Sequence, residues 1–446
     1  MASSSIPSNI PPLIRRHAED AAFFWLQHDT SAYSSRLTLT GLDRFSHLLA
    51  AHLEGIEVAG DAGWQPSLAA LQKWKQTGEA FVCTHAALKN NNASQLDAVM
   101  QEVNARPDEL LRAVISALVW VARPHAVATI SAWSTDQNEP VKQVAALRAV
   151  ALIGQGAAAS LSKSIDHFLS STNDHVRGAA CRAAPACGQS PATDALLRTA
   201  LQDLDLSVRA EAAIALGKHA YTQGKQHSPA AIKVADVLWH AIVAQVDLHN
   251  AAIGWYSKQT LRRLNRWVQH LAWLVSPGNS ELAALLAFMP PRVALRFVAY
   301  HGNPAHLPFV VAQMGDANTA RYAGWVWQTI TGIDIEAAGM TLLELESGDS
   351  PAAVTQSQLD ADSGLALPDA KRIERYATHG LQSGKRYLVG QQLSAAHVLD
   401  VLEQAPQALR SIAVMHLQLS RPEINLALRG PVRVQQQQLS AMRAAL

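Results

Sequence analysis

The chain has 446 residues, of which 49% are apolar and 16% are charged, so its composition excludes an intrinsically disordered protein. Thirty-seven Lys and Arg residues balance thirty-six Asp and Glu residues, and this near-neutral charge excludes a strongly basic nucleic-acid-binding chain. Three cysteines are too few for a disulfide framework, residues 1–20 lack the apolar core of a signal peptide, and no stretch is apolar for long enough to span a membrane. We therefore expect a soluble cytoplasmic protein.

The first region, residues 1–123, is predicted to be helical. Leu42, Phe45, Leu49 and Leu53 recur at the spacing of one helix face, and Gly60 can end that helix. No long run of alternating β-branched residues predicts a sheet. The fold class expected from these patterns is all-α.

A helical repeat is predicted within residues 124–340. Three segments align without gaps from Val141, Val176 and Val208, each with a basic residue one position later and an alanine four positions later. A candidate N-cap stands three residues before each valine, and another candidate helix precedes it. The N-caps are Asn138, Asn173 and Asp205, and the preceding helices are residues 125–133, 158–169 and 193–201. Together with a fourth copy over residues 306–332, these pairs predict an α-solenoid of HEAT-type repeats, in which each pair buries its apolar face by stacking on the next.

The composition changes after the repeats. Residues 322–370 contain eight acidic residues and no Lys or Arg, and residues 341–368 are predicted to form an acidic mobile linker. A C-terminal helical region is expected over residues 369–446, where Asp369 can cap a helix that runs through Tyr376. Further helices are predicted over residues 395–403 and 407–417, and Gly380, Gly384 and Gly390 fit the turns before them.

The sequence contains no motif typical of catalysis or metal binding. Its eighteen histidines include two pairs at i+5, His47 with His52 and His301 with His306, and such pairs lie about 140° apart on a helix. Neither Cys-x-x-Cys nor His-Glu-x-x-His occurs. We therefore expect no catalytic residue, no cofactor and no metal, and a protein that is not an enzyme.

A basic helix flanked by tryptophans is the strongest candidate for a binding surface. Its residues are Lys258, Arg262, Arg263 and Arg266, with Trp255, Trp267 and Trp273. Arg and Trp often dominate protein interfaces, so we predict that this helix lies at the edge of a protein-binding face. Two alternatives stay open. In the first, the helix face is solvated or docks onto the chain's own acidic segment. In the second, its basic side chains and tryptophan rings bind nucleic acid, as in helical-repeat glycosylases.

Several motifs along the chain resemble those of one family, the bacterial HEAT-repeat proteins encoded in type VI secretion gene neighbourhoods. The N-terminal motif is Arg16-His-Ala-Glu-Asp-Ala-Ala-Phe-Phe-Trp25, and the second signature comprises Leu42-Asp-Arg44 and Ala51-His-Leu-Glu-Gly55 with Gly60. The later motifs are Ala320-Arg-Tyr-Ala-Gly324, Ile330-Thr-Gly332, Leu367-Pro-Asp369, Gly384-Lys-Arg-Tyr-Leu-Val-Gly390, and Gln407 with Arg410. The sequence departs from the family pattern at two places. Asp20 supplies the second acid that usually follows His-Ala-Glu, and the aromatic pair that usually precedes the C-terminal glycines is reduced to Tyr376.

The resemblance implies a role but no chemistry, because the family has no agreed activity. Its gene context implies an accessory protein that handles an effector or spike component in the cytoplasm. We therefore expect a protein-binding scaffold that acts as an adaptor or chaperone for such a partner. An immunity protein that neutralises a toxin, and a helical-repeat enzyme acting on nucleic acid, are the alternatives.

Overall fold

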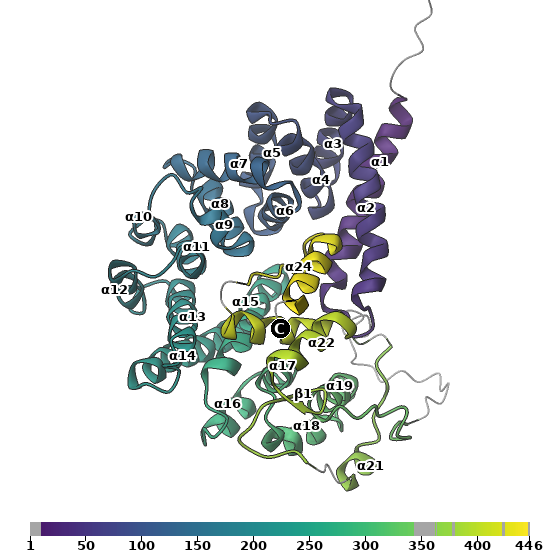
Figure 1. Cartoon of the computed structure of the whole chain (residues 1–446), viewed down its shortest axis with the longest axis vertical. Coiled ribbons are helices and arrows are strands. Elements are labelled where there is room, and N and C mark those ends of the chain that lie inside the picture. The colour runs from purple at the N-terminus through teal and green to yellow at the C-terminus, as the bar shows by residue number, and fades with distance from the viewer. Residues whose placement is uncertain (1–9, 343–361, 363, 377–379, 422–423, 445–446) are drawn as a thin grey trace, which may run out of the picture. The chain divides into compact units, whose positions relative to one another are not determined.

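The computed structural model describes residues 10–342, 362, 364–376, 380–421 and 424–444, and these residues form an almost wholly helical fold (Figure 1). They divide into two compact units. Unit 1 comprises residues 1–215, 402–411 and 421–446, and unit 2 comprises residues 216–401 and 412–420. The predicted C-terminal region is thus shared between the units. The expected all-α class is confirmed.

Unit 1 is a series of helix pairs that pack in chain order. After a hairpin of two long helices, α3 packs on α4, α5 on α6, α7 on α8 and α10 on α11, and the second helices of successive pairs also pack on one another. The helices are α1 Pro11–Thr30, α2 Leu39–Ala59, α3 Asp61–Trp74, α4 Thr77–Lys89, α5 Ala93–Ala105, α6 Pro107–Trp120, α7 Arg123–Thr135, α8 Pro140–Ile153, α9 Gln155–Ala158, α10 Ile165–Leu169, α11 Asp174–Ala183 and α12 Pro191–Ala200. This stacking is the arrangement that a solenoid of helical repeats requires.

The predicted repeat register is confirmed in the second and third copies. Asn173 caps α11 by accepting a hydrogen bond from the backbone N–H of Val176, at 3.1 Å. Asp205 does the same for Val208, at 2.9 Å, where α13 (Leu206–Thr222) begins. Both valines are fully buried, as residues in the seam between stacked helices should be.

Two predictions within this register were wrong. Asn138 does not cap its helix, because α8 begins at Pro140, and Glu139 occupies the N-cap without a side-chain hydrogen bond to the first turn of the helix. Proline supplies no N–H to satisfy and its ring fixes a helical φ, so this helix can start without a polar cap. The single helix expected over residues 158–169 is instead two short helices, α9 and α10, separated by a turn.

An arginine ties successive turns of the repeat together. Arg177 donates two hydrogen bonds to the carboxylate of Asp203 in the next turn, at 2.7 and 2.9 Å. It also donates to the carbonyls of Ser171 and Thr172 in its own turn, both at 3.0 Å. Arg209 repeats this second pattern one copy later. The basic position found by the alignment therefore has a structural role.

Unit 2 continues the helix-pair pattern. Its helices include α14 Pro229–Ala251, α15 Gly254–Leu274, α16 Leu282–Phe288, α17 Pro291–His301, α18 Leu307–Gln313, α19 Ala320–Thr331 and α21 Ala370–Arg375. α14 packs on α15, α15 on α17 and α17 on α19, while α16 and α18 pack on their neighbours. The predicted fourth copy is thus present as the pair α18–α19, and Asp369 caps α21 as expected, at 3.1 Å from the N–H of Arg372.

The remaining elements lie between residues 387 and 444. Strands β1 (Tyr387–Leu388) and β2 (Gln391–Gln392) form a two-residue antiparallel pair, which the sequence patterns did not predict. Helices α22 (Ala395–Gln404), α23 (Gln407–Ser420) and α24 (Val432–Ala444) follow. Within unit 1, Arg410 is completely buried and donates hydrogen bonds to the carbonyl of Leu402 and to the side chains of Gln407 and Gln435.

Most of the predicted acidic linker, residues 343–361 and 363, lies outside the described residues. Asp362 is described and is buried, and its carboxylate accepts two hydrogen bonds from Arg292 of α17, at 2.6 and 2.7 Å. Arg321 also donates to the carbonyl of Leu365. The described end of the acidic segment therefore contacts α17 and α19, and not the basic residues of α15.

Candidate partner-binding surface

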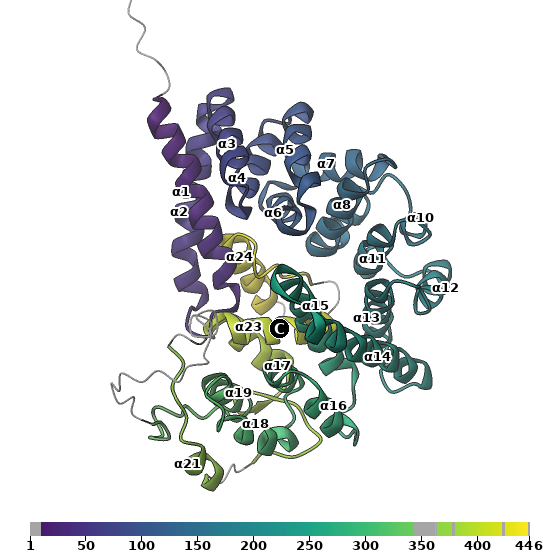
Figure 2. The ribbon, with the colours of Figure 1, turned by 180° about the vertical axis from the view of Figure 1, so that it is seen from behind.

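The predicted basic helix is α15, which pairs with α14 (Figure 2). Gly254 opens it with a φ of +59°, a left-handed backbone conformation that glycine adopts without strain. Thr260, Leu264, Trp267, Val268 and Leu271 are buried, and their spacing of three and four residues places them on one helix face. This face fixes α15 against α14 and α17.

The first turns of α15 expose a mixed aromatic and basic face. Ile253 is 86% exposed, Trp255 and Tyr256 are each 45% exposed, and Leu261 is 36% exposed. Lys258 and Arg262 are exposed beside them, three and seven residues after Trp255 and hence on its side of the helix. We call these six residues, Ile253, Trp255, Tyr256, Lys258, Leu261 and Arg262, the α15 surface. Trp255, Lys258 and Arg262 share one side of the helix, and Tyr256 and Leu261 flank that side to the left and right.

The charge of the α15 surface is not neutralised by the part of the chain that the structure describes. Lys258, Arg262 and Arg263 form no side-chain hydrogen bond or ion pair with any residue that the structure describes. The surface itself contains no acidic residue. It therefore presents two cations among aromatic and aliphatic side chains, a combination that suits a ligand with apolar groups next to carboxylates or phosphates.

The later residues of the predicted binding helix, Arg266, Trp267 and Trp273, are not part of this surface. Trp267 is 1% exposed and Trp273 is 4% exposed, so neither can contact a partner. Arg266 is half-buried and already interacts within the chain. The prediction for Trp267 is wrong because position 267 shares the buried face with Leu264 and Leu271, whereas Trp255 lies on the opposite face.

Trp273 belongs to a buried cluster built around Arg386. The guanidinium of Arg386 donates hydrogen bonds to four backbone carbonyls, those of Ala272, Trp273 and Val275 at the end of α15 and that of His301 at the end of α17, at 2.6 to 3.2 Å. Its carbon lies 5.1 Å from the centre of the Trp273 ring. Burial lowers the pKa of Arg386 to about 10. The negative ends of two helices stabilise this cation in place of a carboxylate.

Three glycines allow residues 387–390 to lie against the ends of α17 and α19. A Cβ atom on Gly302 would lie 2.6 Å from the carbonyl oxygen of Tyr387, and one on Gly332 would lie 2.7 Å from the backbone of Val389. A Cβ on Gly390 would lie 2.7 Å from the carbonyl oxygen of Thr331. Any side chain there would clash with backbone. The motifs around Gly332 and residues 384–390 are therefore two halves of one structural joint.

The two N-terminal motifs also meet in space. The Nδ1 atoms of His17 on α1 and His52 on α2 lie 3.0 Å apart, and His52 stacks on Phe24 with ring centres 5.5 Å apart. A Cβ atom on Gly55 would lie 2.9 Å from the His17 ring, so glycine leaves room for this imidazole. Burial lowers the pKa of His52, and Asp20, 4.0 Å away, acts in the opposite direction.

Towards its C-terminal end, α1 carries a buried polar pair. Asp29 is 4% exposed, and its carboxylate binds the guanidinium groups of Arg112 and Arg429, the latter at 2.9 Å. Neighbouring His28 is fully buried against the edge of Trp120. Burial lowers the pKa of His28 to about 4, so this imidazole is neutral at pH 7. Neither ring nitrogen of His28 has a hydrogen-bond partner among the described residues.

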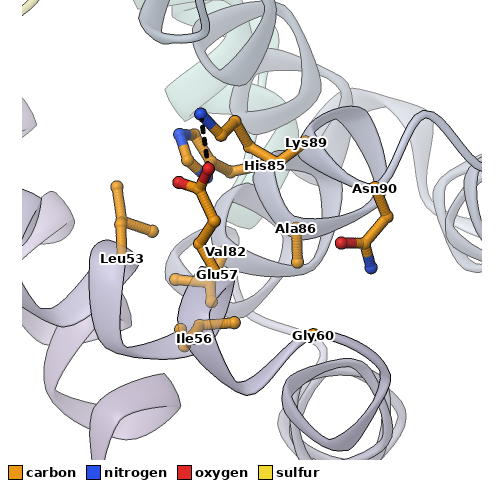
Figure 3. A pocket seen from close by; sticks show the side chains of 9 residues that line it. All are labelled: Leu53, Ile56, Glu57, Gly60, Val82, His85, Ala86, Lys89 and Asn90. Carbon is orange, nitrogen blue, oxygen red and sulfur yellow. Dashed lines mark ion pairs between the residues drawn. The ribbon is translucent and has the colours of Figure 1, made fainter.

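The described pockets are small or open. One pocket in unit 1 lies between α2 and α4, where Glu57 and Lys89 form an ion pair of 2.8 Å beside His85 (Figure 3). The space that water can enter there is about 10 Å³, close to the minimum for one molecule. An open groove of about 630 Å³ borders Asp166 and Cys187. The Asp166 carboxylate accepts a hydrogen bond from the Thr193 hydroxyl at 2.6 Å. Burial raises the pKa of the Cys187 thiol to about 11, which makes this thiol a poor nucleophile at pH 7.

Within the described residues, no cluster of three His, Cys, Asp or Glu side chains is arranged to hold a metal ion, and no helix has the length and apolarity needed to cross a bilayer. Comparison of the chain with protein-family models, curated proteins and solved structures found no match. Among the described residues, the α15 surface thus combines exposed apolar side chains with cations that have no described partner.

Proposed function

We propose that this protein is a non-enzymatic scaffold that binds another protein through the α15 surface. The observation that carries the proposal is the joint exposure of Trp255 and Tyr256 beside the cations Lys258 and Arg262. Aromatic and arginine side chains contribute most of the binding energy in many interfaces. A stack of helix pairs also gives a partner a rigid support, since each pair is fixed by its neighbours.

The partner that suits this surface has apolar side chains flanked by carboxylates. Trp255, Tyr256, Ile253 and Leu261 would pack against the apolar groups, and Lys258 and Arg262 would pair with acidic residues at the rim. The resemblance of the sequence motifs to those of HEAT-repeat proteins from type VI secretion loci supports an effector or spike component as the partner. In this proposal the protein is an adaptor or chaperone in the cytoplasm, and an immunity role is the variant in which the partner is a toxin.

The experiment that tests the proposal is affinity capture from the organism that encodes the chain, with the captured proteins identified by mass spectrometry. Three forms are compared: wild type, Lys258→Glu/Arg262→Glu, and the matched control Arg36→Glu/Arg44→Glu, which reverses two exposed arginines of unit 1. The proposal expects one partner that wild type and control retain and that the α15 variant loses, with unchanged circular dichroism in all three. Equal capture by all three forms would contradict it.

Nucleic-acid binding is the second candidate function, favoured by the same pairing of exposed rings with cations that have no partner among the described residues. Bases can stack on Trp255 and Tyr256 while phosphates bind Lys258 and Arg262. Fluorescence anisotropy with labelled single-stranded DNA and RNA separates this candidate from the first. Binding that weakens steeply with salt, and that is lost in Lys258→Glu/Arg262→Glu, would favour nucleic acid. Absence of binding at low salt would reject it.

A further inference from the structure

Two histidine rings join α1 to α2, which pack side by side in unit 1 (Figure 1). The Nδ1 atoms of His17 on α1 and His52 on α2 lie 3.0 Å apart, and the ring centres lie 5.2 Å apart. This separation of the centres is close to the largest that a 3.0 Å contact between ring nitrogens permits, so the two Nδ1 atoms point at each other. Such an arrangement is a direct hydrogen bond, in which one ring donates and the other accepts.

Neighbouring residues hold the two rings in this position. Phe24 stacks on the His52 ring, with ring centres 5.5 Å apart. A Cβ atom on Gly55 would lie 2.9 Å from the His17 ring. Glycine within a helix is destabilising relative to alanine, and at position 55 it provides the room that His17 needs. The contact between the rings is therefore built into the packing of the two helices.

The charged groups around the pair come from α1. Those that act on His52 are Asp20, His17 and Arg16. The Asp20 carboxylate lies 4.0 Å from Nε2 of His52 and accepts a hydrogen bond from Arg16 at 2.8 Å. Helices α3 and α4 also pack on α1 and α2, but among the described residues no charged group of theirs acts on His52. Residues 1–9 contain no ionisable side chain, so no side chain there can add a charge to the pair.

We infer that the His17–His52 pair binds one added proton and excludes a second, and that acidification therefore separates the first half of α1 from α2. In the neutral pair, one ring donates its Nδ1 proton to the bare Nδ1 of the other. The first added proton binds the bare Nε2 of the donor ring, which keeps the hydrogen bond and makes its donor a cation. The second must bind the accepting Nδ1, and two N–H groups on two cations then face each other. The rings can carry both charges only by moving apart.

The pH range of this switch follows from the difference in bound protons. When the helices are apart, both rings protonate as pH falls below about 6.5, whereas the closed pair takes up only one of these protons. The closed form is therefore favoured most at pH values above 6.5, and it weakens as pH falls below that value. Burial, the largest cause of the lowered pKa of His52, acts in the same direction. We expect opening to be about tenfold easier at pH 5 than at pH 7.

The test compares four forms of the full chain by hydrogen exchange over residues 11–24 at pH 7 and pH 5, corrected for the intrinsic exchange rate at each pH. The forms are wild type, His17→Gln, His52→Gln and the matched control His47→Gln, which changes an exposed histidine of α2. A glutamine amide can donate or accept, so each pair variant keeps a hydrogen bond while its single remaining histidine can protonate without a second cation opposite. His28, near the other end of α1, is the same in all four forms.

The inference expects wild type and His47→Gln to lose about tenfold more protection between pH 7 and pH 5 than His17→Gln or His52→Gln. Equal losses in all four forms would overturn it. Nitrogen-15 NMR of the histidine rings in wild type gives a second measurement that needs no variant to fold. It should show two protonation steps of the pair that are separated by about one pH unit or more, and protonation of both rings in a single step would also overturn the inference. The pair lies in unit 1, so neither result depends on the function proposed for the α15 surface.

Discussion

Replacing Arg386 by methionine tests whether the guanidinium joins the ends of α15 and α17. The change removes the donor to four backbone carbonyls, those of Ala272, Trp273, Val275 and His301. A buried carbonyl that loses its donor costs about 1–3 kcal/mol. Part of the Arg386 side chain is exposed, so water can replace some of these bonds. Removing the cation also removes the free-energy cost of keeping a charge away from water, the same cost that lowers the pKa of Arg386. We therefore expect a net loss of about 3 kcal/mol, equivalent to about two unsatisfied carbonyls.

The assay is thermal unfolding followed by circular dichroism, combined with hydrogen exchange at the ends of α15 and α17. For a unit of this size, 3 kcal/mol corresponds to a fall in Tm of about 6–12 °C. The exposed neighbour provides the control, since Lys385→Met should leave Tm unchanged. Arg386→Lys should fall between the two, because an ammonium keeps the charge but lacks the planar fork that reaches several carbonyls. If Arg386→Met unfolds within about 2 °C of wild type, less than 1 kcal/mol on the same scale, the capping role is refuted.

Three further predictions concern unit 1. Val208→Asp places a charge in a fully buried seam and should cost about 3 kcal/mol or more; an unchanged Tm would show that the repeat register is wrong. Arg177→Met breaks two hydrogen bonds to Asp203 and should cost about 1–2 kcal/mol by urea unfolding, whereas the exposed control Arg36→Met should cost nothing measurable. Because burial lowers the pKa of His28 from 6.5 to about 4, the unfolded chain alone binds this proton between those pH values, and stability falls as pH falls below 6.5. His28→Leu should therefore lose about 2 kcal/mol less than wild type between pH 7 and pH 5, and equal losses in both proteins would contradict the assignment.

Local patterns predicted the elements of this fold well. The N-caps Asn173 and Asp205 and the buried valines after them were read from a nine-residue alignment, because a cap and a small apolar stripe are local requirements of a stacked helix. The turn glycines near residue 384 were predicted for the same reason. Asn138 failed because Pro140 offered another way to start the helix.

Contacts between distant residues were beyond local patterns. Nothing near Arg386 in the sequence shows that its partners are carbonyls more than a hundred residues earlier at the end of α15. Likewise, a tryptophan beside arginines is typical of an interface, yet Trp267 is buried. Helical phase could have separated the two tryptophans, since Trp267 is in phase with Leu264 and Leu271 while Trp255 is not.

Hydrogen exchange of the chain, alone and bound to its captured partner, tests the central claim most directly, because it locates the contact on the intact protein. The account predicts slower exchange over residues 253–262, with the strongest protection at the first turns of α15. It also predicts that Trp255→Ala/Lys258→Ala abolishes both this protection and the binding. Protection confined to other helices, with α15 exchanging equally in the free and bound protein, would contradict the claim that the α15 surface holds the partner.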